Sequence, residues 1–401
     1  MSCMKKRILF IMPSMFIGGA ERSILGLLEA IDYTKYDVTL FLYRHEGEFM
    51  QFIPEQVHVL PEIDRYRTFD VPIKSLLFGR KWMFGAARLL SKAAIVMHTR
   101  VSGEKHGIWM SMQYTSRFLQ PLLPPIPGEY DVGIMFLGVA DTLIRKVNAK
   151  KKLAWCHTDY STLFPDREKD LETYGNVDCV VHVSSDCAKA MLNLYPQLSG
   201  KTKVLENVLA THFIKKQAEE DLSDMNRSGM ERLLLSIGRF CEAKNFDNIP
   251  DICRRLLESG LNVKWFLIGY GGDEPLIRQR IAEADMQEHV VILGKRSNPY
   301  PYIKACDLYV QPSRYEGKCV TVREAQMLGK PVVITNYATA PSQLEDGVDG
   351  VVVPMDNAGC AEGIAQLLRD PQKMDKLSRN CLARDYSNAT EVEKLYRLME
   401  E

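Results

Sequence analysis

Short runs of apolar residues alternate along most of the chain with longer stretches in which apolar residues recur every three or four positions. Short apolar runs bounded by turn residues are typical of buried strands, and the longer spacing is typical of amphipathic helices. Their alternation predicts the α/β class, with doubly wound parallel sheets covered by helices. The expected strands span 7–12, 37–43, 57–60, 131–138, 152–156 and 179–184, and then 233–237, 263–268, 290–293, 308–311 and 331–335.

The alternation is interrupted between residues 211 and 231, where the chain is polar and charged with little periodicity. Such a stretch is typical of a linker. The sequence therefore predicts two Rossmann-like domains, 1–209 and 210–383, and an amphipathic C-terminal helix within 384–401. Further helices are expected at 19–31, 185–194, 249–259 and 275–284.

The composition indicates a folded chain without a dominant charge. The 401 residues are 46% hydrophobic and 25% charged, which suits two domains of roughly 200 residues each. Lys plus Arg equals Asp plus Glu, at 51 each, so no global field favours a nucleic-acid partner. The ten cysteines form no C-x-x-C pair, and we interpret them as core thiols of a reducing compartment.

The N-terminus has some features of a secretion signal, because 5–7 are basic and 8–17 are mostly apolar. Pro13 interrupts this stretch, and 18–22 do not resemble a cleavage site. A first buried strand that ends in a glycine turn fits better. No uncharged apolar run approaches the roughly 18 residues of a membrane span. We therefore expect a cytoplasmic protein.

The stretch 72–120 breaks the alternation and is expected to be a helical insertion into the first domain. It contains eight Lys/Arg and one acid, Glu104. Lys81, Arg88 and Lys92 fall on one helical stripe. Two interpretations remain open: a basic apolar helix in the interface of an anionic membrane, or a hairpin that caps the first sheet and points its charges at water. The apolar residues expected opposite the stripe are Trp82, Met83, Leu89, Leu90 and Met97.

The stretch 313–325 carries the most specific chemistry. Glu316 lies in the turn after an expected strand, and Glu324 lies within the helix that follows. Between them, Gly317 allows the backbone N–H groups of the helix start to approach a ligand closely. Helix N-termini bind phosphate, and carboxylates accept hydrogen bonds from sugar hydroxyls. Taken alone, the stretch could equally be a capped helix with two surface glutamates.

Two cations follow the first strand of the second domain. Arg239 ends the turn after that strand, and Lys244 lies five residues later. A guanidinium and an ammonium that converge can neutralise a diphosphate. In an open parallel sheet, ligands bind at the carboxyl ends of strands, where Arg239, Gly269 and Glu316 would all lie. The combination favours a ligand site over solvated surface charge.

These residues resemble the motifs of retaining GT-B glycosyltransferases, and the chain is similar to glycosyltransferase family 4 over nearly its full length. The resemblance implies two Rossmann-like domains that face each other across a cleft, with a C-terminal helix that crosses back to the first domain. The matching positions are the glutamates Glu316 and Glu324, the cations Arg239 and Lys244, the glycine-rich loop 18–21, and the strand and glycine turn 267–273.

The resemblance also implies roles for single residues. Arg239 and Lys244 would bind the donor diphosphate, and Glu324 the ribose. Glu316 would hold the donor sugar together with His157, a strand-end histidine that, taken alone, would more often be structural. The other expected donor-binding positions are Gly18, Gly19, Gly271, Lys295, Lys318, Cys319 and Val320. The family usually has Glu-Gly-Phe-Gly-Leu where this chain has 316–320, so Lys318 adds a charge and the second glycine is absent.

The expected activity is transfer of a hexose from a nucleotide-sugar, UDP-linked on family frequency, to a saccharide, a lipid-linked glycan or a cell-surface polymer. No Asp-x-Asp motif is present, so no metal or other cofactor is expected. The negative charge that develops on the leaving diphosphate would be balanced by Arg239, Lys244 and helix N–H groups. We expect the acceptor to attack on the same face of the sugar, so that the configuration is retained. The enzyme would act in the cytoplasm, or peripherally at the inner face of the cytoplasmic membrane.

Three other classes of function can be distinguished from transfer. A catalytically silent GT-B scaffold would bind a nucleotide-sugar or glycan without needing the full charged set. A sugar-nucleotide epimerase would convert the donor without an acceptor. An NAD oxidoreductase is disfavoured because the glycine motif at 269–273 lacks its third glycine and the ribose-binding acid that should follow.

Overall fold

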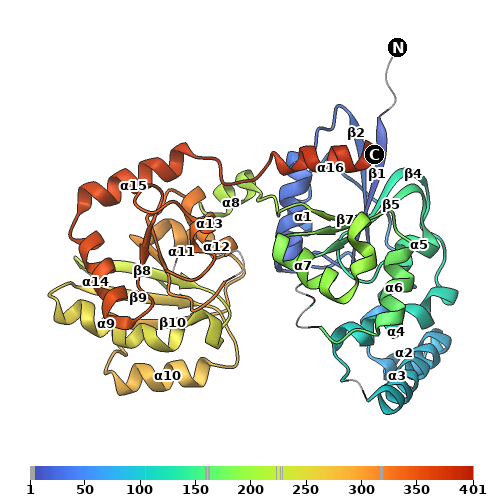
Figure 1. Ribbon diagram of the computed structural model, residues 1–401, viewed down its shortest axis with the longest axis horizontal. Coiled ribbons are helices and arrows are strands. Elements are labelled where there is room, and N and C mark those ends of the chain that lie inside the picture. Colours follow the sequence, from blue (N-terminus) through green and yellow to red (C-terminus); the bar gives the residue numbers. More distant parts are fainter. Residues whose placement is uncertain are drawn as a thin grey trace. The chain divides into compact units, whose positions relative to one another are not determined.

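The computed structural model describes residues 5–103, 105–158, 160, 163–222, 224–225, 227, 229–316 and 319–400. The chain forms two compact units, which Figure 1 colours along the sequence. Unit 1 comprises 1–210 and 388–401, and unit 2 comprises 211–387. Each unit is built around one parallel sheet with helices on both faces, which confirms the predicted α/β class.

The sheet of unit 1 has the strand order β3-β2-β1-β4-β5-β6-β7, with every pair parallel. Its central strands are fully buried because both of their faces are covered, and this explains their continuous apolar runs. The strands are β1 (Lys6–Met12), β2 (Tyr36–Leu42), β3 (His58–Val59), β4 (Glu129–Met135), β5 (Asn148–Cys156), β6 (Cys179–His182) and β7 (Thr202–Val204). The helices α1 (Gly19–Ala30), α5 (Asp141–Lys146), α6 (Arg167–Gly175) and α7 (Ser185–Leu194) connect them.

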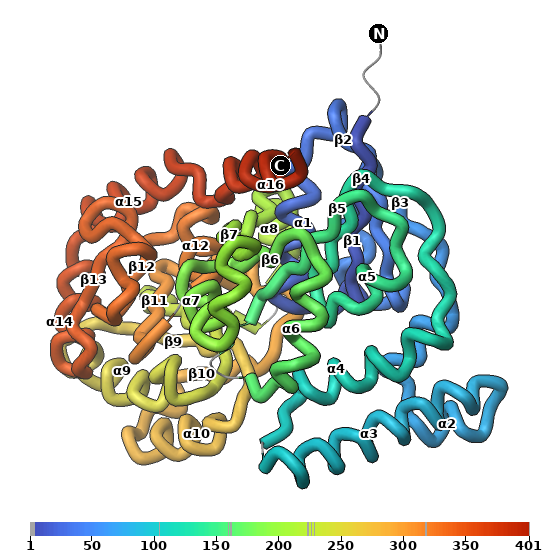
Figure 2. The backbone as a smooth tube through the Cα atoms, turned by 45° about the vertical axis from the view of Figure 1, so that its right-hand side comes forward, coloured from blue at the N-terminus to red at the C-terminus, as the bar shows by residue number. Residues whose placement is uncertain are grey.

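The predicted insertion lies between β3 and β4 and is helical throughout most of its length. It consists of α2 (Ile73–Leu77), α3 (Trp82–Ser102) and α4 (Ile108–Leu119), and Figure 2 shows α3 running alongside α4. The buried side chains of Ile95, Met110 and Tyr114 pack between the two helices. The Tyr114 hydroxyl donates a hydrogen bond to Asp166 Oδ2 at 2.9 Å, which ties α4 to the start of α6.

The orientation of α3 differs from the one that the sheet-capping hairpin implies. The apolar residues opposite the basic stripe are exposed, with Trp82 at 59% and Met97 at 67%. Arg88, expected in a solvent-facing stripe, turns inward and donates hydrogen bonds to the backbone carbonyls of Thr68 and Val71. Both faces of α3 contain apolar residues, so the helical pattern alone did not determine which face packs against the protein.

The sheet of unit 2 has the order β10-β9-β8-β11-β12-β13, again with all strands parallel. Its strands are β8 (Arg232–Ile237), β9 (Val263–Ile268), β10 (Val290–Gly294), β11 (Leu308–Gln311), β12 (Val332–Thr335) and β13 (Val351–Val353). The covering helices are α9 (Ile249–Glu258), α10 (Glu274–Glu283), α11 (Tyr300–Ala305), α12 (Val320–Met327), α14 (Asn357–Leu368) and α15 (Pro371–Ala383).

Several elements were not named by the sequence analysis, among them two short strands and one short helix. β7 and β13 contain three residues each, too few for a recognisable alternation. The expected linker begins with a helix, α8 (Thr211–Gln217), which belongs to unit 2. Its Phe213 is buried edge-to-face against Tyr300, with ring centroids 5.8 Å apart. The stretch 211–231, which is polar on average, therefore begins with a short amphipathic helix that its composition does not indicate.

The last helix, α16 (Glu391–Glu400), returns to unit 1, as the resemblance implies. The Tyr396 ring stacks on Tyr36 of β2, with centroids 4.5 Å apart. Its hydroxyl accepts a hydrogen bond of 2.7 Å from the backbone N–H of Asp32. Val392 and Leu395 are buried on the same helix, so α16 completes the cover of this sheet with its apolar face inward.

Candidate functional site

The candidate donor site of unit 2 lies where three neighbouring strands end. β9, β8 and β11 are adjacent in the sheet and parallel. Their carboxyl ends therefore meet at one edge, and the residues that follow them include Gly269, Arg239 and Glu316. This placement is the one that the sequence predicts.

Lys244 and Glu316 are brought into direct contact at this edge. Lys244 ends the short helix η6 (Glu242–Lys244), and its Nζ lies 2.5 Å from Glu316 Oε1. Both side chains are largely buried, at 17% and 11% exposure. Burial opposes the charged ammonium, but the neighbouring Cys319 and Glu316 outweigh it and raise the pKa of Lys244. Lys244 is therefore a fixed positive charge at neutral pH.

The two loops that carry this pair are fastened to each other by hydrogen bonds. The backbone N–H of Arg314 donates to the Ala243 carbonyl at 2.8 Å. The Asn245 side chain donates to the Pro312 carbonyl at 2.9 Å. Asn245 has a φ of 61°, a left-handed conformation that asparagine tolerates better than most residues. The contact between Lys244 and Glu316 is thus held by backbone interactions on both sides.

Further residues position Glu316, and the motif search did not find them. Ser313 Oγ donates to Glu316 Oε1 at 2.6 Å, and Thr339 Oγ1 donates to the Glu316 carbonyl at 2.8 Å. The Gln343 side chain accepts from the Cys319 N–H at 2.7 Å and donates to the Cys319 carbonyl at 3.1 Å. Thr339 and Gln343 lie far along the chain, at the N-cap and the last residue of the short helix α13 (Ala340–Gln343) after β12, where no spacing pattern marks them. Ser313, by contrast, stands inside the motif.

Arg239 is the exposed cation of the site. It follows Gly238 at the end of β8 and makes no hydrogen bond or ion pair with any residue that the structure describes. A Cβ atom on Gly238 would lie 3.1 Å from Lys244 Cε, so a side chain there would crowd the second cation. Arg239 is therefore free to bind an anion, whereas Lys244 is held in place by Glu316.

The glycine turn after β9 approaches the β8 loop very closely. A Cβ atom on Gly271 would lie 2.2 Å from the Phe240 carbonyl oxygen, and the Phe240 N–H donates to the Tyr270 carbonyl at 2.9 Å. Only glycine fits there. Nearby, Lys295 Nζ lies 5.5 Å from the centroid of the Tyr270 ring. Both side chains are exposed, which leaves an aromatic and cationic surface beside the predicted base-reading position.

Glu324 is placed differently from Glu316. It lies on α12 with only 1% exposure, and the Tyr300 hydroxyl donates to its Oε1 at 2.8 Å. Cys319 and Val320 form the start of α12, where the predicted helix N-terminus is found. Gly317 and Lys318 lie outside the described residues. Glu316 and Cys319 thus precede α12, Val320 is its first residue, and Glu324 lies one turn further along it.

The predicted glycines of unit 1 lie at the start of α1, after the carboxyl end of β1. Gly18 is the N-cap, and a Cβ atom there would lie 2.2 Å from Glu21 Oε2. Burial raises the pKa of the Glu21 carboxyl, although a hydrogen bond with its own backbone opposes this. A Cβ atom on Gly19 would meet nothing within 4 Å. The first turn of α1 is therefore open on the Gly19 side.

His157 follows β5 directly, at the carboxyl edge of the same sheet. Its ring lies 4.7 Å from the Phe136 ring and stacks beside Trp155. Burial lowers the pKa of His157 to about 4, and a hydrogen bond with the Phe136 backbone opposes this shift. The Nε2 atom is buried without a partner among the described residues. The imidazole is neutral near pH 7, and it can exchange a hydrogen bond but does not act as a charged acid.

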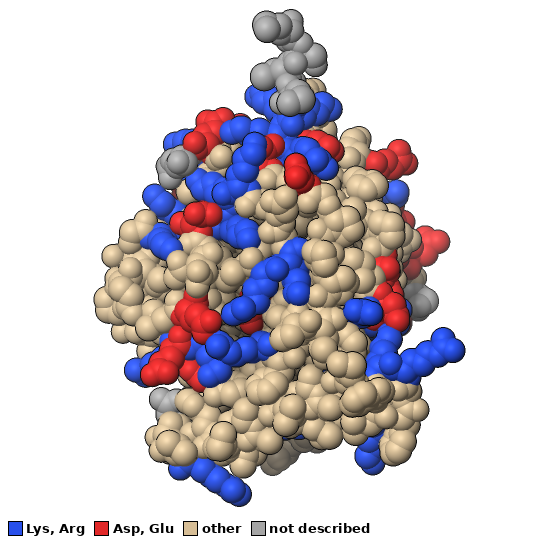
Figure 3. All heavy atoms as spheres, turned by 90° about the vertical axis from the view of Figure 1, so that its right-hand side faces the viewer, with Lys and Arg blue, Asp and Glu red and all other residues tan. Residues whose placement is uncertain are grey.

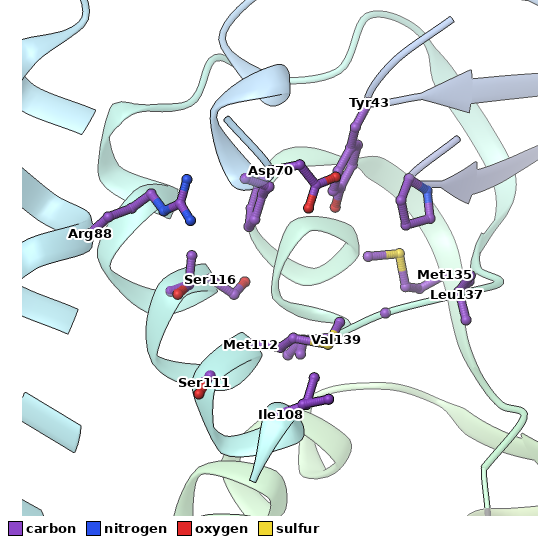
Figure 4. A pocket seen from close by; sticks show the side chains of 14 residues that line it. Tyr43, Asp70, Arg88, Ile108, Ser111, Met112, Ser116, Met135, Leu137 and Val139 are labelled. Atoms are coloured by element: carbon purple, nitrogen blue, oxygen red, sulfur yellow. The ribbon is translucent and has the colours of Figure 1, made fainter. Parts of the chain in front are cut away.

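Unit 1 also contains a cavity of about 380 Å³ that motif reasoning did not find. It lies between the carboxyl edge of the sheet and the insertion, and Figure 4 shows the Arg88 side chain entering from α3 while the Asp70 carboxylate points toward Tyr43. Asp70 forms an ion pair of 3.1 Å with Arg44. Burial lowers the pKa of the Arg88 guanidinium, and the charge of Asp70 opposes this shift. The lining residues are Pro13, Tyr43, Phe69, Asp70, Arg88, Ile108, Ser111, Met112, Thr115, Ser116, Met135, Leu137, Gly138 and Val139.

No group of three or more His, Cys, Asp or Glu side chains is arranged to hold a metal ion within the part of the chain that the structure describes. Over the same residues, no helix combines the length and apolar character that crossing a membrane requires.

Comparison with known proteins identifies the second unit. Residues 217–384 match the family Glycosyl transferases group 1, and this segment contains Arg239, Lys244, Glu316 and Glu324. The resemblance drawn from these motifs is thereby confirmed. An uncharacterised glycosyltransferase of Methanocaldococcus jannaschii is 26% identical over 173 residues, which is 43% of each chain.

A second relative is the N-acetylgalactosamine-N,N'-diacetylbacillosaminyl-diphospho-undecaprenol 4-alpha-N-acetylgalactosaminyltransferase of Campylobacter jejuni, 24% identical over 52% of this chain and 55% of that protein. The first curated relatives are matched over about two fifths of their length, between 34% and 43%. The structure of HepE from Anabaena, in complex with UDP and glucose, superposes over 99% of this chain and 100% of that one, with a TM-score of 0.62 and 17% identity. The chain thus has the GT-B fold.

Proposed function

We propose that this chain, whose residues 217–384 form a Glycosyl transferases group 1 domain, is a retaining glycosyltransferase that moves a hexose from a UDP-sugar to a glycan or lipid-linked glycan. The observation that carries the proposal is the contact of 2.5 Å between Lys244 and Glu316, with the unpaired Arg239 beside it. A scaffold that only binds a glycan would not need two cations and a carboxylate at one strand edge.

The proposed donor mode follows from the charges at this edge. Arg239 would bind the diphosphate with its guanidinium fork, and Lys244 would supply a fixed charge that needs no rearrangement when the phosphate leaves. Glu316 would accept hydrogen bonds from the hydroxyls of the sugar. Glu324, which is buried beside Tyr300, would hold the ribose. These roles come from the resemblance, and the observed contacts support them.

The proposed reaction proceeds on one face of the sugar and without a metal ion. The bond from the anomeric carbon to the diphosphate breaks, the acceptor oxygen bonds to that carbon, and the leaving phosphate oxygen takes the acceptor proton. The developing negative charge would be balanced by Arg239, Lys244 and the N-terminal N–H groups of α12. Neutral His157 would contribute a hydrogen bond to the sugar. Nuclear magnetic resonance of the product anomer tests retention, and activity in excess EDTA tests metal independence.

For the acceptor we propose the cavity of unit 1. It lies at the carboxyl edge of its sheet, where ligands of parallel sheets bind. Its wall combines apolar side chains with a few polar groups such as Ser111 and Ser116, the composition usual for small-molecule sites. The Campylobacter relative is named for transfer to a diphospho-undecaprenol-linked saccharide, which supports an acceptor with an apolar part. We also propose that the protein works in the cytoplasm, at the inner face of the membrane.

The deciding experiment measures nucleotide release from a panel of UDP-sugars and GDP-mannose, with and without glycan acceptors. We expect turnover of one UDP-sugar, and its loss in Glu316→Gln and Lys244→Met. Glu258→Gln and Lys376→Met provide matched controls, because both residues are exposed in unit 2 away from the site. Donor binding without turnover in the wild type would indicate a scaffold. Conversion of the donor without an acceptor would indicate an epimerase.

A further inference from the structure

The outward side of the insertion presents a continuous apolar surface to solvent. Its members are exposed between 46% for Leu89 and 92% for Phe78. On α3 they occur as adjacent pairs that repeat every seven residues (82–83, 89–90 and 96–97), followed by Val101, so they share one side of a helix of 21 residues. We call this surface the α3 face, and it consists of Phe78, Trp82, Met83, Leu89, Leu90, Val96, Met97 and Val101.

The opposite side of the helix is already used for packing. Phe84, Ala87, Ser91 and Ile95 are buried against the rest of unit 1. The apolar residues of the α3 face are therefore additional to those that fold the protein. A row of such length is unusual on a protein that stays in water, where large apolar residues are normally exposed singly. An exposed apolar surface of this size indicates a binding partner.

The surroundings of the α3 face are positively charged. Lys74, Arg80, Lys92, Arg100 and Lys105 are all exposed, and none forms an ion pair with a residue inside the described ranges. Arg88 is directed inward, and Lys81 is neutralised by Asp64 at 2.5 Å. Figure 3, which views this side of the molecule, shows a mostly uncharged surface at the height of α2 and α3, with Lys and Arg around it.

We propose that the α3 face seats in the interfacial layer of an anionic lipid bilayer. An amphipathic helix with cations around an apolar side inserts its apolar residues at the headgroup boundary and attracts anionic lipids. Trp82, at the start of α3, is the residue type that prefers this boundary. Lys92 and Arg100 have long side chains that keep their charges among the headgroups while the apolar stems are buried.

A second copy of the chain is the other partner that such a surface could take. Two copies pressed together through the α3 face would bring two sets of unpaired cations against each other, with no acid of the face to neutralise them. An anionic bilayer neutralises them instead. The charge pattern therefore favours lipid over self-association.

Seating of α3 on a membrane would place the cavity of unit 1 close to the lipid. Arg88 lines that cavity from the other side of the same helix, and Ile108 lines it while being 83% exposed. An acceptor with a lipid anchor could then reach the cavity without leaving the bilayer. This consequence rests on the proposed function, whereas the membrane contact itself does not.

Sedimentation of the full chain with vesicles tests the contact. We expect the wild type to bind phosphatidylcholine vesicles that contain phosphatidylglycerol, and to bind pure phosphatidylcholine much less. Leu90→Glu with Met97→Glu should lower the partition coefficient at least about 100-fold, because each change places a charge where an apolar side chain would enter the bilayer. Lys92→Ser and Arg100→Ser should each lower it about fivefold, and only with anionic vesicles.

Met230→Glu with Leu276→Glu is the matched control, since both residues are exposed in unit 2, and it should bind as the wild type does. Absence of wild-type binding, or equal binding by Leu90→Glu with Met97→Glu, would overturn the proposal. A wild-type dimer that these two changes dissociate, without vesicle binding, would assign the face to a second copy. Nucleotide-sugar turnover with a water-soluble acceptor should be unchanged in every variant, so a failure of the transferase proposal would be seen separately.

Discussion

The carboxyl edges of the two sheets carry opposite kinds of surface, although both sheets are parallel and share one construction. In unit 2 the edge is a polar network in which Ser313, Lys244 and Glu316 are joined within hydrogen-bond distance. In unit 1 the edge borders a cavity with apolar walls, and His157 leaves one buried nitrogen without a partner among the described residues.

The difference arises from the segments that follow the strands. The loops after β8 and β11 are short and fastened to each other through the Arg314 N–H and the Asn245 side chain. Unit 1 instead places the insertion with α3 and α4 over the strand ends. A parallel sheet therefore fixes where ligands bind, while the connecting segments decide which chemistry they meet. A charged donor suits the first edge and a partly apolar acceptor the second.

The largest effect is expected from Lys244→Met. The change removes the fixed positive charge and leaves Glu316 as a mostly buried carboxylate without its cation. We expect kcat to fall about 1000-fold, since loss of one preorganised charge or donor typically costs 100- to 1000-fold. Steady-state nucleotide release measures it, with Lys376→Met as control. A loss below tenfold would show that Lys244 is structural, and the polar edge would then lose its assigned role.

Arg239→Ala should have the next largest effect on activity, because it removes the proposed partner of the diphosphate. Arg239 is exposed and has no partner among the described residues, so the change should leave folding intact. We expect kcat/KM for the donor to fall about 100-fold, with an unchanged melting temperature. Arg239→Lys should restore only part of the activity, because an ammonium lacks the bidentate fork. Arg280→Ala on α10 is a control on the same unit. Equal activity of Arg239→Ala and the wild type would contradict diphosphate binding at this residue.

The polar edge was largely predictable from the sequence, and the apolar edge was not. Arg239, Lys244 and Glu316 lie in the segments that follow two neighbouring apolar strands, so the topology brings them to one edge. Thr339 bonds the Glu316 carbonyl and Gln343 bonds the Cys319 backbone, both from a distant short helix, and these contacts depend on tertiary packing that no local spacing encodes.

The insertion shows where periodicity is insufficient. The pattern of 72–120 predicts helices correctly, but it does not determine which side of α3 packs inward, because apolar residues occupy both sides. For α16 the same type of pattern has one apolar side only, and Leu395 and Tyr396 are buried as expected. The two helices differ in their neighbours: α16 packs on Tyr36 of β2 through Tyr396, whereas the outer side of α3 faces solvent.

A third effect concerns the stability of unit 1. His182, at the end of β6, is fully buried, and neither ring nitrogen has a partner among the described residues. Burial lowers its pKa to about 4, below the ordinary 6.5. The unfolded chain therefore takes up a proton as pH falls below about 6.5 while the folded chain does not until about 4, so stability falls over that interval.

His182→Leu should remove this loss. We expect the free energy of unfolding at pH 5 to rise by about 2 kcal/mol relative to the wild type, with a smaller gain at pH 7 from removal of the unpaired nitrogens. Urea unfolding at the two pH values measures it. His58→Leu, at an exposed position of β3, should show no such pH dependence. If the free energy of unfolding changed equally with pH in His182→Leu and in the wild type, His182 would have polar partners in solution.

The smallest effect should come from filling the cavity. Met112 lines it and is 37% exposed, so Met112→Trp adds volume without disturbing the sheet. We expect KM for the acceptor to rise about tenfold while donor hydrolysis without acceptor stays constant, because the change affects only one of the two edges. Met355→Trp, an exposed position of unit 2, is the control. A matching fall in donor hydrolysis would mean that the two edges are not separable, and the division between a charged donor edge and an apolar acceptor edge would fail.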